Sequence, residues 1–456
     1  MTNKYHITVL LIIFLLLPFS TSAEEGKKNK FLDIQVVSDK TNNITAWLVE
    51  DHSIPVIAMS FSFRGAGAKN DPSDKQGLAR LTSNTMDEGA GELTSQEFQK
   101  TLRDLSISLS FSAGRDNFSG GLKTLSQNKE KAFELLKLAL TKPRFDEEPV
   151  GRMRDSNKSR IKSSLSNPRW IAARLQNDRL FEGHSYAMNS GGTLSSLDKI
   201  TPDDLREFHK TLGKNQLVIG VAGDINAEEL EKIINNIFGD LPDIETKTTE
   251  KYPLKNAGKT YIYKRDIPQS IIAMAQAGIS RDDKDYYAAT LMNFILGESG
   301  FGSRLMEEIR EKRGLTYGIY SYFRRYDEAD TLNASTSTKN KNVKEMISLI
   351  HKEWEKMKSE PVSEEEINDA KSYIIGSLPL SLTSTDSIAG ILLSLQLEHL
   401  PIDYLDMRAE KIKAVKINDI LNVSKRILDK DSITTVIVGA PEGIEADIIT
   451  DIPNVE

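Results

Sequence analysis

The chain has no cysteine among its 456 residues and only six histidines. The absence of cysteine excludes disulfide bonds, thiolate metal sites, a cysteine nucleophile and a lipid anchor on cysteine. An excess of positive charge is also missing, because 66 acidic residues outnumber 59 basic ones and give a formal net charge of −7. This balance argues against a nucleic-acid-binding protein. A Gly-x-Ser-x-Gly elbow, a phosphate-binding loop and a dinucleotide-binding fingerprint are missing as well.

The apolar run near the N-terminus, Val9 to Leu17, is too short to span a bilayer comfortably. Lys4 precedes the run, and the small residues Thr21 and Ala23 follow it. These features are typical of a secretory signal, so we predict that residues 1–23 are a cleaved signal peptide. An uncleaved amphipathic anchor is the alternative. Export without a stable membrane anchor follows, and the bacterial periplasm is the expected compartment.

The remaining chain contains an internal repeat. Ile54–Phe61 is echoed by Ile267–Met274, and Gln216–Gly223 by Thr434–Pro441, at nearly the same separation. A repeat of this length indicates two copies of one structural unit.

The segment 241–259 lies between the copies. It has lost apolar periodicity and contains two prolines, so we predict a linker there. The predicted domains are therefore residues 24–240 and 260–456.

Each copy reads as strand, strand, helix, hairpin, helix, helix and closing strand. Capping boxes at Thr94–Glu97 and Ser363–Glu366 open helices, and residues 107–111 and 118–122 form a hairpin. This order predicts an α+β fold in which two homologous domains each layer helices on a mostly antiparallel sheet.

The segment Gly297–Phe323 combines a glycine-rich loop, a short helix and an aromatic strand. Ser303 can cap the helix, and cations including Arg310 gather in its last turn. Gly314 is the natural C-terminal cap, so the helix should end near it. The expected buried face of this helix consists of Leu305, Met306 and Ile309.

Leu315–Phe323 is rich in aromatic and β-branched residues and is predicted to be a strand, with Tyr317 near its start. A cation, Arg310, and a phenol hydroxyl would then converge near one loop. Two interpretations stay open. Arg310 can complement the helix dipole while Tyr317 fills a sheet face, or both can donate to a carbonyl oxygen.

The run from Arg310 to Tyr317, with Gly297–Arg304 before it, resembles the C-terminal domain of the pitrilysin or insulinase family of zinc metallopeptidases. The resemblance implies that Arg310 and Tyr317 hold substrate opposite a zinc site, in a chain shaped like half a clamshell. Gly300 and Gly302 would belong to a substrate-binding or hinge loop, with a simple helix-to-helix turn as the alternative.

In that family the two His residues of a His-x-x-Glu-His motif and a carboxylate on a later helix bind the zinc, and the Glu of the motif activates water. In this chain Arg80 and Asn84 stand at the two His positions, and Ser83 at the Glu position. The third ligand position falls at or near Arg160. Cations repel Zn²⁺ and a hydroxyl is a poor general base, so these degenerate positions should hold no metal.

The five histidines after the predicted signal peptide are scattered along the chain. None has a metal-binding partner three to five residues away, and they are expected to be satisfied polar groups. They are His52, His184, His209, His351 and His399.

The resemblance implies that the chain is the non-zinc subunit of an exported heterodimeric zinc metalloendopeptidase. The zinc would belong to a partner subunit of the same family, this chain would bind no cofactor, and the substrate would be an unfolded peptide. Two alternatives remain. One is a catalytically inert peptide-binding or scaffold protein from the same family, and the other is a self-sufficient peptidase with an unusual metal site.

Overall fold

The computed structural model describes residues 30–245 and 249–456. The predicted signal peptide lies outside the described residues, as does part of the predicted linker. Among the residues that are described, no helix is both long enough and apolar enough to cross a membrane.

The first half of the chain builds one six-stranded sheet. Its strands are β1 (Gln35–Asp39), β2 (Ile44–Glu50), β3 (Val56–Phe63), β4 (Ser108–Ala113), β5 (Phe118–Leu125) and β6 (Leu217–Gly223). Their order in the sheet is β1-β2-β6-β3-β5-β4. All neighbouring pairs are antiparallel except β2 and β6.

The helices of this half are α1 (Leu78–Ser83), α2 (Ser95–Asp104), α3 (Lys129–Thr141), α4 (Glu147–Ser164), α5 (Pro168–Leu180), α6 (Leu194–Lys199), α7 (Pro202–His209) and α8 (Ala227–Phe238). The predicted capping box is present at the start of α2, where Thr94 and Glu97 exchange hydrogen bonds. Most of the buried apolar residues of this half join one core between the sheet, α3 and α8.

The second half repeats this plan. Its strands are β7 (Thr260–Lys264), β8 (Gln269–Ala277), β9 (Ile319–Arg325), β10 (Asp330–Lys339), β11 (Thr434–Gly439) and β12 (Ile448–Ile449), in the order β12-β7-β11-β8-β10-β9. Its helices are α9 (Tyr286–Asn293), α10 (Val343–Ser359), α11 (Glu364–Gly376), α12 (Thr385–Leu397), α13 (Tyr404–Ala414) and α14 (Ile417–Ile427), with π-helical segments η5 (Phe294–Glu298) and η6 (Met306–Glu311).

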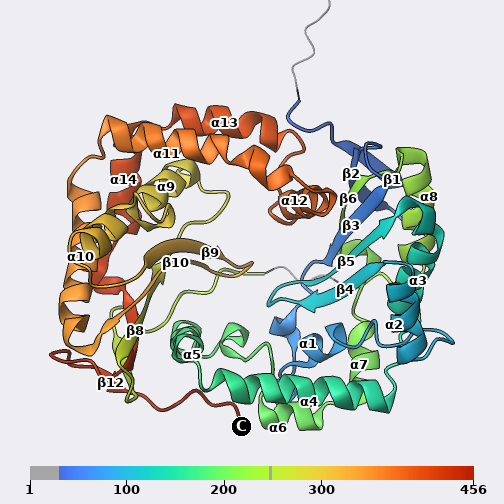
Figure 1. The fold of residues 1–456 in the computed structure, drawn as a ribbon, viewed down its shortest axis with the longest axis horizontal. Coiled ribbons are helices and arrows are strands. Elements are labelled where there is room, and N and C mark those ends of the chain that lie inside the picture. The colour runs from blue at the N-terminus through green and yellow to red at the C-terminus, as the bar shows by residue number, and fades with distance from the viewer. Residues whose placement is uncertain (1–29, 246–248) are drawn as a thin grey trace, which may run out of the picture.

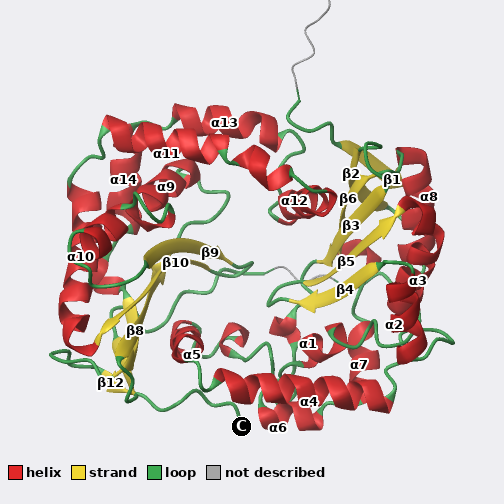
Figure 2. Cartoon of the chain, viewed as in Figure 1, coloured by secondary structure: helices red, strands yellow, loops and turns green. Residues whose placement is uncertain are grey.

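The α+β prediction is confirmed, with helices layered against two mixed sheets (Figure 2). The echoed segments take equivalent places, because β6 and β3 are neighbours in one sheet as β11 and β8 are in the other. The two sheets differ at one edge, which is formed by β1 in the first half and by β12 in the second. β1 precedes β2 and pairs with it antiparallel, whereas β12 follows β11 in the chain and lies parallel to β7. The predicted boundaries at 240 and 260 stay a prediction.

Each sheet is also covered by a helix from the other half. Helix α12 packs on β6 and β3, and α5 packs on β11 and β8 (Figure 1). Gly220 of β6 allows this approach, because a Cβ atom there would lie 2.4 Å from the carbonyl oxygen of Ala389 in α12. The two halves are therefore interlocked.

Candidate functional site

The helix that carries Arg310 is present, although much of it is π-helical. In η6 (Met306–Glu311) backbone N–H groups donate to carbonyls five residues back, which widens the helix. Ser303 caps it as predicted, since its Oγ accepts from the N–H of Met306 at 3.4 Å. At the other end Gly314 has a φ of +62°, and its N–H donates to the carbonyl of Arg310 at 2.9 Å. The predicted cap positions are confirmed.

Tyr317 lies before the strand. The strand was predicted to start at Leu315, and this is wrong, because β9 begins at Ile319. Threonine hydroxyls of β10 hold the connection in place of ladder hydrogen bonds. Thr338 donates to the carbonyl of Leu315 at 2.6 Å, and Thr336 donates to a second carbonyl of the connection at 3.0 Å. The Tyr317 side chain is left 86% exposed, which contradicts the interpretation that it fills a sheet face.

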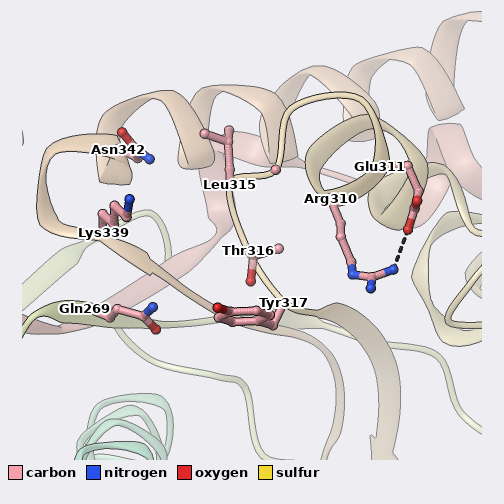
Figure 3. A pocket seen from close by; sticks show the side chains of 9 residues that line it. Gln269, Arg310, Glu311, Leu315, Thr316, Tyr317, Lys339 and Asn342 are labelled. Carbon is pink, nitrogen blue, oxygen red and sulfur yellow. Dashed lines mark hydrogen bonds and ion pairs between the residues drawn. The ribbon is translucent and has the colours of Figure 1, made fainter.

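Arg310 and Tyr317 line one pocket with a volume of about 420 Å³ (Figure 3). Gln269 of β8 and Lys339 of β10 face each other in register on its opposite side. In Figure 3 the Tyr317 hydroxyl points to the side of Gln269 and Lys339, whereas Arg310 turns toward Glu311. The pocket is completed by Gly314, Leu315, Thr316 and Asn342. Arg310 and Tyr317 therefore lie near one loop, as the sequence predicted. Their side chains do not form a hydrogen bond with each other.

The glycine loop shapes the outer wall beside Arg310. Gly300 and Gly302 have φ values of +68° and +103°, which favour glycine, and they project Phe301 into solvent with 71% exposure. The Arg310 guanidinium lies 4.4 Å from the centroid of the Phe301 ring and also pairs with Glu311. Neither the two glycines nor Phe301 line the pocket, so the loop reaches it only through the contact of Phe301 with Arg310.

Lys312 and Arg313, which follow η6, do not line the pocket. Lys312 and Arg313 both donate to Glu308, the latter at 2.7 Å, and these hydrogen bonds lower the pKa of Glu308 to about 2. Arg304 is paired with Glu366, so among the described cations from Arg304 to Arg313 only Arg310 lines the pocket.

The positions expected to be degenerate zinc ligands lie where α1 meets α4. Asn84 donates to the carbonyl oxygen of the Asn157 side chain at 3.0 Å, and Ser83 donates to the backbone carbonyl of Arg80 at 2.8 Å. Burial and the positive charge of Arg160 lower the pKa of Arg80. The structure thus brings all four predicted positions together and adds Asn157, one turn before Arg160.

Comparison with known proteins identifies the chain. Residues 59–189 match the insulinase family, peptidase family M16, and residues 199–374 match the peptidase M16 inactive domain. The chain belongs to the M16 peptidase family. It is 26% identical over 385 residues to the non-peptidase homolog YmxG of Helicobacter pylori, covering 83% of this chain and 89% of that one.

Solved M16 structures have the same fold. The peptidase M16 inactive domain from Pseudomonas fluorescens matches with a TM-score of 0.82 and 27% identity, over 91% of this chain and all of that one. A protease from Helicobacter pylori matches with a TM-score of 0.78 over 90% of this chain and 99% of that one, at 18% identity, which shows the fold alone.

The residues of this M16 member do not fit zinc. The three ligand positions hold two guanidinium groups and an amide, at Arg80, Arg160 and Asn84. The general-base position holds the hydroxyl of Ser83, the neighbouring Asn157 adds a second amide, and none of these groups is a zinc ligand. In the part of the chain that the structure describes, no group of three His, Cys, Asp or Glu side chains could hold a metal ion. This chain is an M16 member without the zinc-binding residues of the active peptidases.

Three histidines of this M16 fold form hydrogen bonds, among them His209, whose Nε2 lies 2.6 Å from the carbonyl of Leu140. His184 Nε2 lies 2.8 Å from Glu328, and His52 lies between Glu50, at 2.8 Å, and Asp224, at 2.6 Å. Carboxylates thus engage both ring nitrogens of His52 and the Nε2 of His184, whose Nδ1 accepts from the N–H of Tyr186. The expectation that every histidine is satisfied is wrong for His351, because its buried Nε2 has no partner among the described residues.

Sequence reasoning missed Gln269, Lys339 and Asn342 in the pocket and Asn157 beside Asn84. These residues lie on strands and helices far from the motif in the chain, and no local pattern marks them. The pairing of β8 with β10 brings the first three to Tyr317.

Proposed function

We propose that this M16 member is the non-zinc subunit of an exported, periplasmic, heterodimeric zinc metalloendopeptidase. Its partner would be a zinc-bearing member of the same family, and the substrate an unfolded peptide. The observation that carries the proposal is the Tyr317 side chain, which is 86% exposed over a pocket that also contains Arg310.

The exposure of Tyr317 favours a binding role over a structural one. A large aromatic side chain contributes to folding through burial, and this one buries little of its surface. Its hydroxyl forms no hydrogen bond with another described residue, so the donor is available to a ligand. Arg310 is half-buried and adds a positive charge at the same pocket.

In the assembly these two side chains would act as hydrogen-bond donors. Zinc in the partner would supply the activated water, and this chain would not take part in that step. Tyr317, with Arg310, would donate to the carbonyl oxygen of the peptide as negative charge develops on it. Losing one such donor typically costs about 3 kcal/mol of transition-state stabilisation, roughly a hundredfold in rate.

The neighbouring strand offers a way to hold an extended peptide. β9 (Ile319–Arg325) follows Tyr317 directly and is an edge strand of its sheet. An extended peptide can add to such an edge through main-chain hydrogen bonds, which suits unfolded substrates.

A catalytically inert peptide-binding or scaffold protein is the second candidate. The similarity to the non-peptidase homolog YmxG favours it. It would use the same pocket to bind peptide without contributing to cleavage.

The first experiment is to tag the mature chain, recover it from its native exported fraction and identify any protein that co-purifies in equal amount. The expected companion carries His-x-x-Glu-His. Recovery of the chain alone, inactive toward unfolded peptides, would favour the scaffold candidate.

With the companion in hand, Tyr317→Phe should reduce peptide cleavage by about a hundredfold and leave assembly intact. Its free energy of unfolding should stay within about 0.5 kcal/mol of the wild-type value, because the side chain is exposed. Tyr320→Phe is the matched control, since Tyr320 is an exposed tyrosine of β9 that does not line the pocket. Full cleavage activity in Tyr317→Phe would remove the role assigned to the hydroxyl.

A further inference from the structure

The surface where α1 meets α4 presents hydrogen-bond donors in place of metal ligands. Arg80 and Asn84 are four residues apart and share one face of α1. Asn157 and Arg160 are three residues apart and share one face of α4. The hydrogen bond from Asn84 to Asn157 shows that the two faces meet, since α1 packs on α4.

Two of these donors have no partner. Asn157 is 2% exposed, and its Nδ2 has no hydrogen-bond partner among the described residues. The Nε of Arg80 is also buried without one. Leaving a buried polar group unpaired costs free energy, so native proteins rarely keep two together without a ligand or water between them.

The two arginines are also without a carboxylate, within the described ranges, although acidic residues neutralise other cations of α4. Arg152 pairs with Glu88 at 2.8 Å, and Lys158 pairs with Asp198 at 2.7 Å. Neither Arg80 nor Arg160 forms an ion pair with a described residue. Two like charges are thus held near each other with no compensating anion from this part of the chain.

We propose that this cluster, defined by Arg80, Asn84, Asn157 and Arg160, binds a peptide carboxylate. The planar guanidinium of Arg80 matches the two oxygens of a carboxylate, and the free amide N–H of Asn157 adds a neutral donor. Arg160 is exposed and supplies the second positive charge at the entrance. The positions that hold a cation in active M16 peptidases hold an anion in this chain.

The identity of the ligand as a peptide rests on the proposed function, and its carboxylate has two sources. It is either the C-terminal carboxylate or the side chain of Asp or Glu. Three forms of one short acetylated peptide separate them. The first ends in a free carboxylate and has no acidic side chain, the second is its C-terminal amide, and the third is the amide with one internal Glu.

The experiment measures the affinity of each fluorescently labelled peptide for the full mature chain by anisotropy at low salt. Arg80→Gln and Arg160→Gln should each weaken binding of the carboxylate-bearing form by about tenfold or more, because each removes a charge-assisted contact. Lys162→Gln is the matched control. It removes one positive charge from an exposed position of α4 on another face, and binding should stay within about twofold.

Preference for the first peptide assigns the site to the C-terminal carboxylate, and preference for the third assigns it to an acidic side chain. Equal affinity for all three forms, or unchanged affinity in both arginine variants, would overturn the inference. Arg160→Gln keeps the test valid if Arg80→Gln fails to fold, because Arg160 is exposed. Tyr317→Phe should retain the preference for the carboxylate-bearing peptide. A loss of cleavage in this variant therefore tests the proposed function, and a loss of peptide binding in the arginine variants tests the carboxylate site.

Discussion

The ammonium of Lys69 lies 2.9 Å from the carboxylate of Glu328, although the two residues are 259 positions apart in the chain. Lys69 belongs to the first half, and Glu328 lies in the turn between β9 and β10 of the second. The Lys69 side chain is 7% exposed and also lies 3.3 Å from Asp116 and 3.4 Å from Asp327. Burial opposes its charge, but these carboxylates raise the pKa of Lys69 overall.

Lys69→Met should destabilise the protein strongly. The substitution leaves Asp116, Asp327 and Glu328 close together without their cation, and breaking a buried charge group in this way costs roughly 3–5 kcal/mol. Urea unfolding of the full chain measures the loss. Lys75→Met is the control, because Lys75 pairs with Asp204 in a more exposed site and should cost about 1 kcal/mol or less. Similar costs for the two variants would contradict the prediction.

Gly220→Ala should disrupt the contact between the halves. The new methyl group would lie 2.4 Å from the carbonyl oxygen of Ala389, so α12 must shift, at a cost of about 1–3 kcal/mol. Gly151→Ala is the opposite case. Gly151 lies inside α4 with open space around it, and alanine there should stabilise the protein by about 0.5–1 kcal/mol. Thermal unfolding that shifts in the same direction for both would refute this account.

The burial of Asp71 should make the free energy of unfolding fall as pH rises. Its carboxylate accepts from the N–H groups of Gly77 and Ala79 at the start of α1, at 2.9 and 3.0 Å. Burial nevertheless raises the pKa of Asp71 from 3.8 to about 7. The folded state therefore binds more protons than the unfolded state between these values, so this contribution to stability is present below about pH 4 and is lost as pH rises through 7.

The shift is equivalent to about 4 kcal/mol at most. The measurement compares urea unfolding of the wild type and of Asp71→Asn, which does not titrate, at several pH values from 4 to 8. The wild type should lose stability relative to Asp71→Asn as pH rises. A difference that stays constant, or that grows in favour of the wild type, would show that the hydrogen bonds to α1 keep Asp71 ionised throughout.

A zinc site should be recoverable at the junction of α1 and α4. Arg80→His and Asn84→His provide two ligands on one helix face, Asn157→Glu provides the third, and Arg160→Gln removes the remaining charge. Isothermal titration should show zinc binding by this fourfold variant. The same variant with Asn157 retained is the control and should bind much more weakly, because the contact with Asn84 brings a glutamate at position 157 within reach of a metal ion held on α1. Equal binding by the two would show that position 157 does not supply a ligand.

Local patterns predicted much of the fold and part of the site. Hydrophobic periodicity and capping boxes located the helices that begin after Thr94 and Ser363, and the internal repeat predicted two copies of one structural unit, which differ only at one sheet edge in the order of their strands. The local patterns failed at Leu315–Gly318, where they predicted a strand. Aromatic and β-branched composition cannot show that threonine hydroxyls of β10 take the place of strand-pairing hydrogen bonds in this segment. They also did not distinguish an α-helix from the π-helix of η6.

The sequence by itself determined what this chain cannot do at its former metal site, since the side chains at positions 80, 83 and 84 are no zinc ligands in any conformation. It also placed Arg310 and Tyr317 near one another, because a short helix and its glycine cap fix that distance locally. Only the tertiary structure decided that Tyr317 is exposed, that Lys339 and Gln269 share its pocket, and that Asn157 meets Asn84. These relationships depend on strand pairing and helix packing between distant segments, which bury or expose side chains without leaving a local pattern.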